Sequence, residues 1–321
     1  MIIVTGAAGF IASCMVEKLN EEGLENLIIV DDFSIPEKMD NWKSKRYSER
    51  VQRNELEAWL KNNSDKVELI IHLGARTDTT EFDTAIFDKL NVAYSKMLWD
   101  FAVQQGVPLI YASSAATYGG GEHGYEDRHD IIDQLQPLNP YGESKNQFDQ
   151  WAIDQNNAPS HWYGLKFFNV YGPNEYHKGR MASVIFHAYN QIKANGSMKL
   201  FRSHNPEYKN GEQLRDFIYV KDVVDMIWYL IQNKPASGLY NFGTGEARTF
   251  LDLTKATFKA MGVEEDISFI DTPEDIRDKY QYFTEADMSK FINTGYQDSF
   301  TPLEEGVTDY VQNYLMKEKR Y

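Results

Sequence analysis

Two side chains suited to proton transfer, Tyr141 and Lys145, lie four positions apart in the segment Tyr-Gly-Glu-Ser-Lys. This segment follows Asn139-Pro140 at the start of a predicted helix, where residues four apart share one face. An ammonium beside a phenol favours the phenolate, and lowering a tyrosine pKa from ~10 by about 3 corresponds to roughly 4 kcal/mol. The spacing therefore predicts that Tyr141 is a general base near neutral pH, although the same spacing also occurs on ordinary surface helices.

A hydroxyl group that could assist this chemistry is Ser114, in the segment Ser-Ser-Ala-Ala-Thr soon after a predicted strand, Pro108–Tyr111. The carboxyl ends of parallel strands face the ligand crevice of a sheet. Ser114 can therefore donate a hydrogen bond to an oxygen that gains negative charge during a reaction. The alternative is a serine that only caps the turn after the strand.

A glycine-containing loop, Thr-Gly-Ala-Ala-Gly-Phe-Ile-Ala, lies between the first predicted strand and the first predicted helix. Gly6 permits a tight turn, Gly9 lets the backbone approach a pyrophosphate, and Ala12 is a small residue where helix and strand pack closely. The free N–H groups at the start of the helix can then bind phosphates. A plain glycine turn is the alternative, but the position between a strand and a helix favours a dinucleotide site. The oxidised nicotinamide of such a dinucleotide would act with Lys145 to favour the Tyr141 phenolate.

The second predicted strand leads into Asp31, where a carboxylate can accept a hydrogen bond from an adenosine ribose hydroxyl. This carboxylate favours NAD, because it would repel a 2′-phosphate. Lys38 and Arg53 follow in a polar region and could pair with that phosphate, which would favour NADP. Both could instead be solvated surface charges, so these residues leave the 2′ position of the cofactor open.

Short apolar runs alternate with longer amphipathic stretches along the first half of the chain. The predicted buried strands are Ile2–Val4, Leu27–Val30, Leu69–Ile71, Pro108–Tyr111 and Gly164–Phe168. The clearest helical patterns between them are Phe10–Glu22, Asp83–Gln105 and Tyr141–Gln155. This alternation predicts an α/β fold, a Rossmann-type doubly wound parallel sheet.

After Phe168 the pattern loosens, and irregular pieces interrupt helices such as Met181–Ala194. A later unit, Asp216–Val220 followed by a helix and Leu239–Phe242, is expected to return to the main sheet. We therefore predict a dinucleotide-binding domain of residues 1–168 and 216–243. A smaller, discontinuous substrate-binding α/β domain would contain residues 169–215 and 244–321.

The composition excludes several classes of protein. The formal net charge of -15 makes the chain a poor general binder of nucleic acid or of an anionic membrane. Its one cysteine, Cys14, excludes an internal disulfide and a cysteine-cluster metal site, and we expect no metal. The apolar runs are too short to cross a membrane, and no basic and apolar leader is evident. We therefore expect a cytoplasmic protein without a signal peptide.

The motifs in this order resemble the extended short-chain dehydrogenases, which include the nucleotide-sugar epimerases and dehydratases. The glycine loop, Ser114, Tyr141 and Lys145 carry the resemblance, and it covers almost the whole chain, because Phe168–Pro173 and Arg215–Val220 also fit. More narrowly, the chain resembles the ADP-glycero-manno-heptose 6-epimerases. The segments that carry this narrower resemblance are Tyr111–Gly120, Phe283–Asp287 and, as the most discriminating, His177–Val184.

The narrower resemblance implies a tightly bound nicotinamide cofactor, usually NADP with NAD possible, that takes hydride from carbon 6 of an ADP-heptose and returns it to the opposite face. It implies cofactor contacts at Phe10, Ile11, Asp31, Asp32, Lys38, Asn91, Lys145 and Val170. It implies sugar-nucleotide contacts at Asn169, Arg180, His187, Phe201, Arg202, Ser203, Arg215 and Tyr280. Some of these could instead be core aromatics, a solvated arginine or a structural histidine. The family also suggests a homo-oligomer, often a pentamer.

A 6-epimerase must handle an oxygen that lies in different places in the two epimers, because the bond between carbon 6 and the ring can rotate. One fixed base cannot reach both positions within hydrogen-bonding range. Lys178, in the discriminating segment, offers a second acid/base besides Tyr141. The alternative is a lysine that binds a phosphate or lies at the surface.

Three other functions compete with this interpretation. A 4,6-dehydratase normally has a Thr-Asp-Glu set, whereas Ala115, Ala116 and Thr117 follow Ser114 here. A ring-carbon epimerase acting on a UDP-sugar does not account for the segment that contains Lys178. A catalytically silent NAD(P)-sensing protein would not need Ser114, Tyr141 and Lys145 together.

The chain departs from the family pattern in two places. Ala12 replaces the usual third glycine, which the loop tolerates. The stretch Ser203–Leu214 is longer than usual, which puts the nucleotide contacts of Arg202 and Ser203 in doubt.

Overall fold

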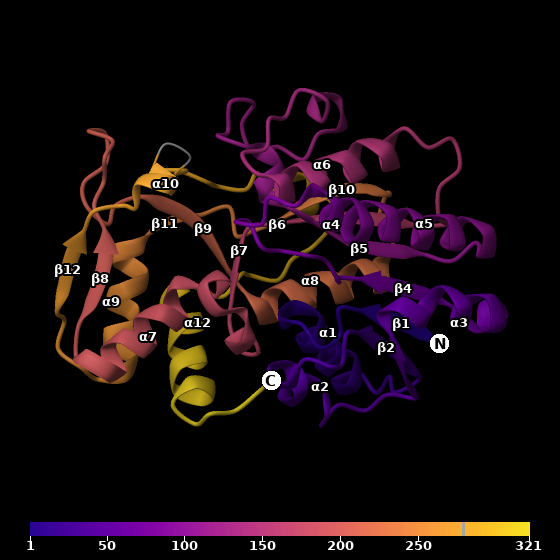
Figure 1. Cartoon of the computed structure of the whole chain (residues 1–321), viewed down its shortest axis with the longest axis horizontal. Coiled ribbons are helices and arrows are strands. Elements are labelled where there is room, and N and C mark those ends of the chain that lie inside the picture. The colour runs from indigo at the N-terminus through magenta and orange to yellow at the C-terminus, as the bar shows by residue number, and fades with distance from the viewer. Residues whose placement is uncertain (278–279) are drawn as a thin grey trace.

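A seven-stranded sheet forms the centre of the computed structural model, which describes residues 1–277 and 280–321. All of its neighbouring strands pair in parallel, in the order β10-β6-β5-β4-β1-β2-β3 (Figure 1). The strands are β1 (Ile2–Thr5), β2 (Leu27–Asp31), β3 (Glu49–Gln52), β4 (Leu69–His72), β5 (Leu109–Ser114), β6 (Trp162–Phe167) and β10 (Gly238–Phe242). The chain runs outward from β1 to β3 and then returns to the other side at β4. This reversal is the switch point where such sheets bind ligands, and the predicted fold class is confirmed.

The strands β2, β4 and β10 are buried along their whole length because helices cover both faces of the sheet. On one face α1 packs beside α8, and on the other α5 and α6 pack around a π-helical segment, residues 88–93 (Figure 1). These main helices are α1 (Phe10–Glu21), α3 (Leu56–Asn63), α5 (Tyr94–Gln105), α6 (Pro140–Ile153) and α8 (Val220–Asn233). Shorter helices are α2 (Met39–Trp42), α4 (Thr84–Phe87), α10 (Glu274–Arg277) and α11 (Ser289–Ile292).

Two smaller sheets lie beyond the carboxyl ends of the main strands (Figure 1). One contains β7 (Asn169–Tyr171), β9 (Leu214–Tyr219) and β11 (Ala247–Thr249), and the other pairs β8 (Met198–Phe201) with β12 (Ile267–Ile270). The helices of this region are α7 (Val184–Asn195), α9 (Phe250–Met261) and α12 (Leu303–Asp309). A second apolar cluster joins α7 and α9 to β8, and its buried members are Ala188, Ile192, Met198, Leu200 and Phe258.

The predicted return to the main sheet is correct for β10, which pairs with β6, and wrong for the strand before it. That strand, β9, pairs with β7 and β11 instead. The reason lies in Asp216, whose buried carboxylate accepts hydrogen bonds from the backbone N–H groups of Thr244, Gly245 and Ala286. These bonds hold β9 against later segments of the chain. The predicted division into two domains stays a prediction.

Helices that could cross a membrane are absent from the described part of the chain, since none is both long and apolar enough.

Candidate active site

The glycine loop and the end of β4 are in direct backbone contact. Gly6 has a φ of +72°, and a Cβ atom added there would lie 2.6 Å from the Cα atom of Gly74. Gly9 caps α1 without a side-chain hydrogen bond, and the first turn of α1 contains no acidic residue. The N–H groups at the start of α1 are therefore free to bind an anion. They border a cavity of about 360 Å³ whose lining includes Gly6, Gly9, Phe10 and Ile11.

Paired charges line the same cavity at the end of β2. Asp31 is buried and accepts hydrogen bonds from the backbone N–H groups of Ala8 and Asp32, while the Lys38 ammonium lies 3.3 Å from its Oδ1 atom. The Arg53 guanidinium lies 3.8 Å from Asp32 Oδ2. The pKa of Asp32 is lowered, mainly by hydrogen bonds from Ser34 and further by the charge of Arg53. Lys38 therefore lies beside Asp31, the carboxylate at which we expect the adenosine ribose, and Arg53 lies beside the next residue, Asp32.

The predicted trio Ser114, Tyr141 and Lys145 comes together where β5 ends against α6. The Ser114 hydroxyl is within hydrogen-bonding reach of the Tyr141 phenol, and it also accepts a bond from Ala116 N at 3.1 Å. Ser114 therefore also caps the turn after β5, as considered above. It accepts the bond of this cap, so the cap does not use its hydroxyl proton. Asn139 caps α6 by accepting a bond from Gly142 N, which fixes the start of the helix.

The expected lowering of the Tyr141 pKa is not produced by the protein groups alone. Burial raises the pKa of the phenol, the hydrogen bond with Ser114 lowers it, and the charge of Asp149 raises it. Lys145 donates a 2.8 Å hydrogen bond to the Ala112 carbonyl, and burial lowers its own pKa to about 8. The chain by itself therefore keeps Tyr141 protonated at neutral pH. The predicted phenolate depends on the charge of an oxidised nicotinamide as well as on Lys145, and it stays a prediction.

Lys178 lies in the cofactor cavity, on a 3-10 segment formed by Tyr176–Met181. Its Nζ atom is 5.7 Å from the centre of the Phe10 ring, which belongs to the glycine loop. Burial lowers the pKa of Lys178, and the carboxylate of Glu175 raises it. Glu175 is fully buried and accepts hydrogen bonds from the backbone N–H and the hydroxyl of Ser183 at 2.5 and 2.6 Å. These bonds hold together the two ends of the segment that carries Lys178.

The remaining predicted cofactor contacts lie next to the cavity. Asn91 is in the π-helical segment, where it bonds both backbone groups of Arg76 and donates to the Ser144 hydroxyl on α6. Val170 is half-buried on β7. Neither side chain is among those that line the cavity.

Three of the predicted sugar-nucleotide contacts form one group. The rings of Phe201 and Tyr280 are 6.4 Å apart and nearly perpendicular, and the Arg215 guanidinium lies 5.5 Å from the Tyr280 ring. Arg215 is buried and donates hydrogen bonds to the carbonyl groups of Leu214 and Gln281. A flat aromatic group with a cation above it suits an adenine or a phosphate-bearing ligand.

The other predicted substrate residues are not drawn into this group. Arg202 is exposed and lies 3.5 Å from Asp271, and Ser203 bonds only within its own loop, to Asn205 and Asn210. Asn169 and Arg180 are exposed. His187 is half-buried on α7.

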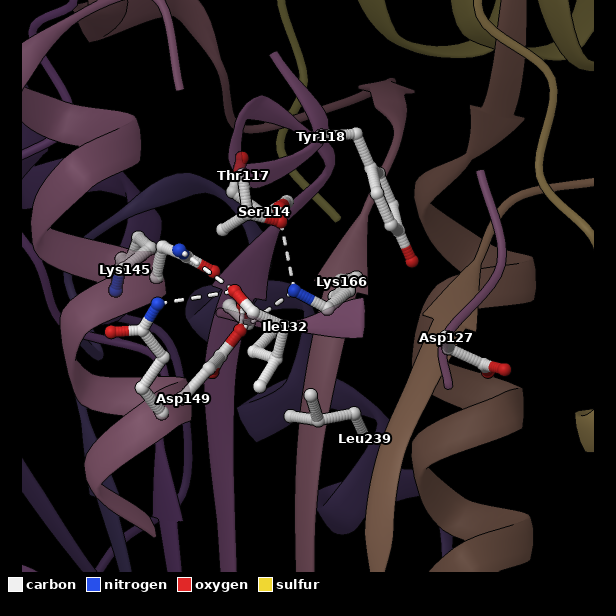
Figure 2. A network of polar contacts seen from close by, with 12 residues as sticks. Ser114, Thr117, Tyr118, Asp127, Ile132, Lys145, Asp149, Lys166 and Leu239 are labelled. Atoms are coloured by element: carbon white, nitrogen blue, oxygen red, sulfur yellow. Dashed lines mark hydrogen bonds and ion pairs between the residues drawn. The ribbon is translucent and has the colours of Figure 1, made fainter. Parts of the chain in front are cut away.

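A buried polar network beneath this site was missed in the sequence (Figure 2). Asp149 on α6 accepts bonds from Tyr111, Ser113 and the Lys166 ammonium of β6. Lys166 also donates to Thr117, 2.8 Å away. Two signals were available: Asp149 follows Tyr141 and Lys145 at the same helical spacing, and Lys166 is a charge inside an otherwise apolar strand.

The cavity also has walls that the sequence analysis did not single out. They follow β4 in the segment Leu-Gly-Ala-Arg-Thr-Asp and include Gly74, Arg76, Thr77 and Asp78, together with Tyr94, His177 and Met181. The signal was the polar segment directly after a buried strand. In the part of the chain that the structure describes, no group of three or more His, Cys, Asp or Glu side chains could hold a metal ion.

The comparisons with known proteins agree with this geometry. The ADP-L-glycero-D-manno-heptose-6-epimerase of Fusobacterium nucleatum is 50% identical over the whole of both chains, and the enzyme of that name from Nitratidesulfovibrio vulgaris is 49% identical over 98% of both. Among solved structures, the Helicobacter pylori ADP-L-glycero-D-manno-heptose-6-epimerase matches with a TM-score of 0.82 and 26% identity, covering 97% of this chain and 95% of that one. MoeE5 in complex with UDP-glucuronic acid and NAD matches with a TM-score of 0.77 and 25% identity, covering 99% of both.

The resemblance predicted from the motifs is confirmed by these relatives and by a family model that matches residues 2–243. The chain therefore belongs to the NAD dependent epimerase/dehydratase family.

Proposed function

We propose that this protein is an isomerase that interconverts ADP-D-glycero-D-manno-heptose and ADP-L-glycero-D-manno-heptose by transient oxidation at carbon 6. The observation that carries the proposal is the place of Lys178. It comes from the segment most particular to heptose epimerases and lies in the same cavity as the glycine loop. The relatives that are about half identical over their full length are named for this reaction. We also propose a homo-oligomer, on the family resemblance.

The residues around the cavity fit a dinucleotide. The free N–H groups of α1 and Asp31, which border the cavity, would hold the pyrophosphate and the adenosine ribose. Lys145, which is not part of that lining, would hold the nicotinamide ribose. A bound nicotinamide would supply the acceptor and donor of the carbon 6 hydride, and its positive charge would favour the Tyr141 phenolate. We propose NADP as the natural cofactor, because Lys38 and Arg53 both lie beside Asp31 and Asp32 and could neutralise a 2′-phosphate.

Tyr141 and Lys178 would act as the two acid/base groups. One of them removes the proton of the carbon 6 hydroxyl during oxidation, and the other gives a proton to the ketone oxygen after the bond to the ring has rotated. Ser114 would donate a hydrogen bond to the substrate oxygen as negative charge develops on it. Which base serves which epimer is left open. At the other end of the substrate, Phe201, Arg215 and Tyr280 would hold the ADP portion.

The proposal is tested by supplying pure ADP-D-glycero-D-manno-heptose and following the configuration of carbon 6 by NMR. We expect the L-glycero epimer to accumulate to equilibrium without stoichiometric consumption of added cofactor. Reduced cofactor that accumulates in proportion to product would identify a dehydrogenase instead. A carbon 6 that keeps its configuration while the enzyme inverts a UDP-sugar would identify a ring-carbon epimerase.

The cofactor proposal has its own test. Heat extraction of the purified protein should release NADP, which is then identified by chromatography. We expect bound cofactor because the mechanism does not require it to leave between turnovers. A Lys38→Ala, Arg53→Ala double variant should bind NADP at least about tenfold more weakly while its affinity for NAD changes little. An equal loss for both dinucleotides would mean that these cations do not contact the 2′-phosphate.

A further inference from the structure

A buried ion pair lies directly beneath the three residues that we assign to the reaction. The Lys166 ammonium and the Asp149 carboxylate are 2.8 Å apart, and the two residues are 1% and 0% exposed. Figure 2 shows the two side chains pointing toward each other, below the turn that holds Ser114 and Thr117. Burying two charges is costly and often does not stabilise a fold, so such a pair calls for an explanation other than stability.

The pair connects β5 and α6, the two elements that present Ser114, Tyr141 and Lys145. Asp149 lies on α6, two turns after Tyr141 and one after Lys145, and it accepts bonds from Tyr111 and Ser113 on β5 at 3.0 and 2.5 Å. Lys166 comes from β6 and donates to the Thr117 hydroxyl.

The turn after β5 completes the connection. The Thr117 hydroxyl donates in turn to the Ser114 carbonyl at 2.8 Å, and Lys145 donates to the carbonyl of Ala112 at the same distance. The strand end that presents Ser114 is therefore tied to the helix that presents Tyr141 by bonds that pass through one ion pair.

We propose that Asp149 and Lys166 are positioning residues, which hold Ser114 in register with Tyr141 and Lys145, and that the Asp149 carboxylate also acts on Lys145 through its charge. The proposal rests on the function proposed above. Neither residue would touch substrate or cofactor. Their effect would pass through Lys145 and through the Thr117 turn.

The charges around Lys145 support this role for Asp149. Burial lowers the pKa of Lys145 to about 8, and the Asp149 carboxylate is the group that raises it. His72 faces Lys145 from β4, but burial lowers the pKa of His72 to about 3. His72 is therefore neutral at working pH and contributes no charge to the surroundings of Lys145. Tyr141 shares the helix face and is protonated. Without Asp149, the pKa of Lys145 would be lower still.

The surroundings of Asp149 leave Lys166 as the cation that compensates it. Tyr111 and Tyr118 face the pair with pKa values raised well above 10, so both are neutral, and the Lys166 ammonium lies 5.1 Å from the Tyr118 ring. His129 also feels the charge of Asp149, but burial lowers its pKa. Lys166 thus balances the carboxylate at 2.8 Å, while Asp149 still raises the pKa of Lys145 through its charge.

The test measures the Lys145 pKa directly, on the enzyme as purified. The protein is labelled with lysine carrying ¹³C at Cε, the Lys145 signal is assigned by its loss in Lys145→Arg, and the pH titration is followed by NMR. In Asp149→Asn we expect the pKa of Lys145 to fall by at least about 1, the usual effect of losing a nearby opposite charge. The basic limb of the pH–rate profile should move down with it.

Controls separate this effect from general damage to the fold. Glu57→Gln removes one partner of an exposed ion pair, 2.9 Å from Lys61, and should leave the Lys145 pKa unchanged. If Asp149→Asn does not fold, the double variant Asp149→Asn, Lys166→Met is compared with the single variant Lys166→Met, and its Lys145 pKa should be the lower of the two. An unchanged Lys145 pKa in Asp149→Asn, or equal Lys145 pKa values in this second comparison, would overturn the assigned role of the charge.

The positioning role is tested at Lys166. Lys166→Met should lower kcat for both epimers with little change in KM, and Lys166→Arg should restore much of the loss because it can bond both Asp149 and Thr117. A Lys166→Met enzyme with the parent kcat would overturn the positioning role. If the parent enzyme itself does not act on ADP-heptose, the proposed function fails, while the NMR result on Lys145 remains independent of it.

Discussion

The two proposed acid/base residues are held by very different parts of the molecule. Tyr141 lies near the start of α6, a helix capped by Asn139 and tied to β6 through a buried ion pair. Lys178 lies on the short 3-10 segment Tyr176–Met181, which is interrupted by Gly179. The buried carboxylate of Glu175 holds the two ends of this segment together through its bonds to Ser183.

This difference matches what each group would have to do. The tyrosine is placed by the same helix that positions Lys145, so its distance to the nicotinamide is fixed by the fold. The lysine is placed by a local loop and can be changed without disturbing the sheet. The comparison predicts that changes in the segment around Lys178 affect only the half-reaction that depends on Lys178. Changes that disturb α6 move Tyr141 and Lys145 together and should affect both half-reactions.

The largest effects are expected from removing each base. Tyr141→Phe and Lys178→Met should each slow epimerisation by at least about a hundredfold, the typical contribution of one acid/base catalyst. Both proteins should stay folded and cofactor-bound, because neither change alters the glycine loop or Lys145. Each variant should oxidise one pure epimer and fail with the other, which is followed by the absorbance of enzyme-bound reduced nicotinamide.

A parent rate of interconversion in Lys178→Met would contradict the comparison. Lys178 would then be only a binding or surface residue, and one tyrosine would have to serve both faces.

A smaller effect is expected at Glu175. Replacing it with Gln removes the carboxylate that raises the pKa of Lys178 and weakens the hydrogen bonds that Glu175 accepts from Ser183. We expect the half-reaction that depends on Lys178 to slow by about tenfold, with its rate profile moved to lower pH, and the half-reaction that depends on Tyr141 to change little. Glu207→Gln, at an exposed position of another loop, is the control. Equal slowing of both half-reactions would show that Glu175 supports the whole site.

The smallest effect is expected at Gly179, whose φ of +53° and ψ of -128° suit glycine alone. Gly179→Ala meets no atom within 4 Å, so its cost is the backbone strain itself, on the order of 1–3 kcal/mol. We expect a few-fold loss confined to the half-reaction of Lys178. Gly23→Ala is a matched control, because Gly23 has a φ of +79°, equally open surroundings and a place outside the site. It should lower the melting temperature without changing either half-reaction.

The sequence was most informative where function depends on neighbouring residues. The loop with Gly6 and Gly9, and the pair Tyr141 and Lys145, are set by local turns and by the helical period, so their spacing was enough to place them. Asp31 and its two cations followed from the end of one strand.

The parts that the sequence did not reveal depend on pairings between distant segments. The contact of Gly6 with Gly74, and that of Asp149 with Lys166, exist only once the strands are ordered in the sheet. The position of β9 outside the main sheet depends on the hydrogen bonds of Asp216. Burial, which the sequence does not give, raises the pKa of the Tyr141 phenol in the chain by itself.

The order of strands also bears on how the protein is made. Strand β6 is completed by β10, but residues 168–237 separate them, and a ribosome needs on the order of 10 seconds to add such a stretch. During that time the backbone groups along one edge of β6 have no partner, and the strand is largely apolar. We expect nascent chains that end before Gly238 to aggregate or to bind chaperones. Nascent chains that extend past Phe242 should do neither.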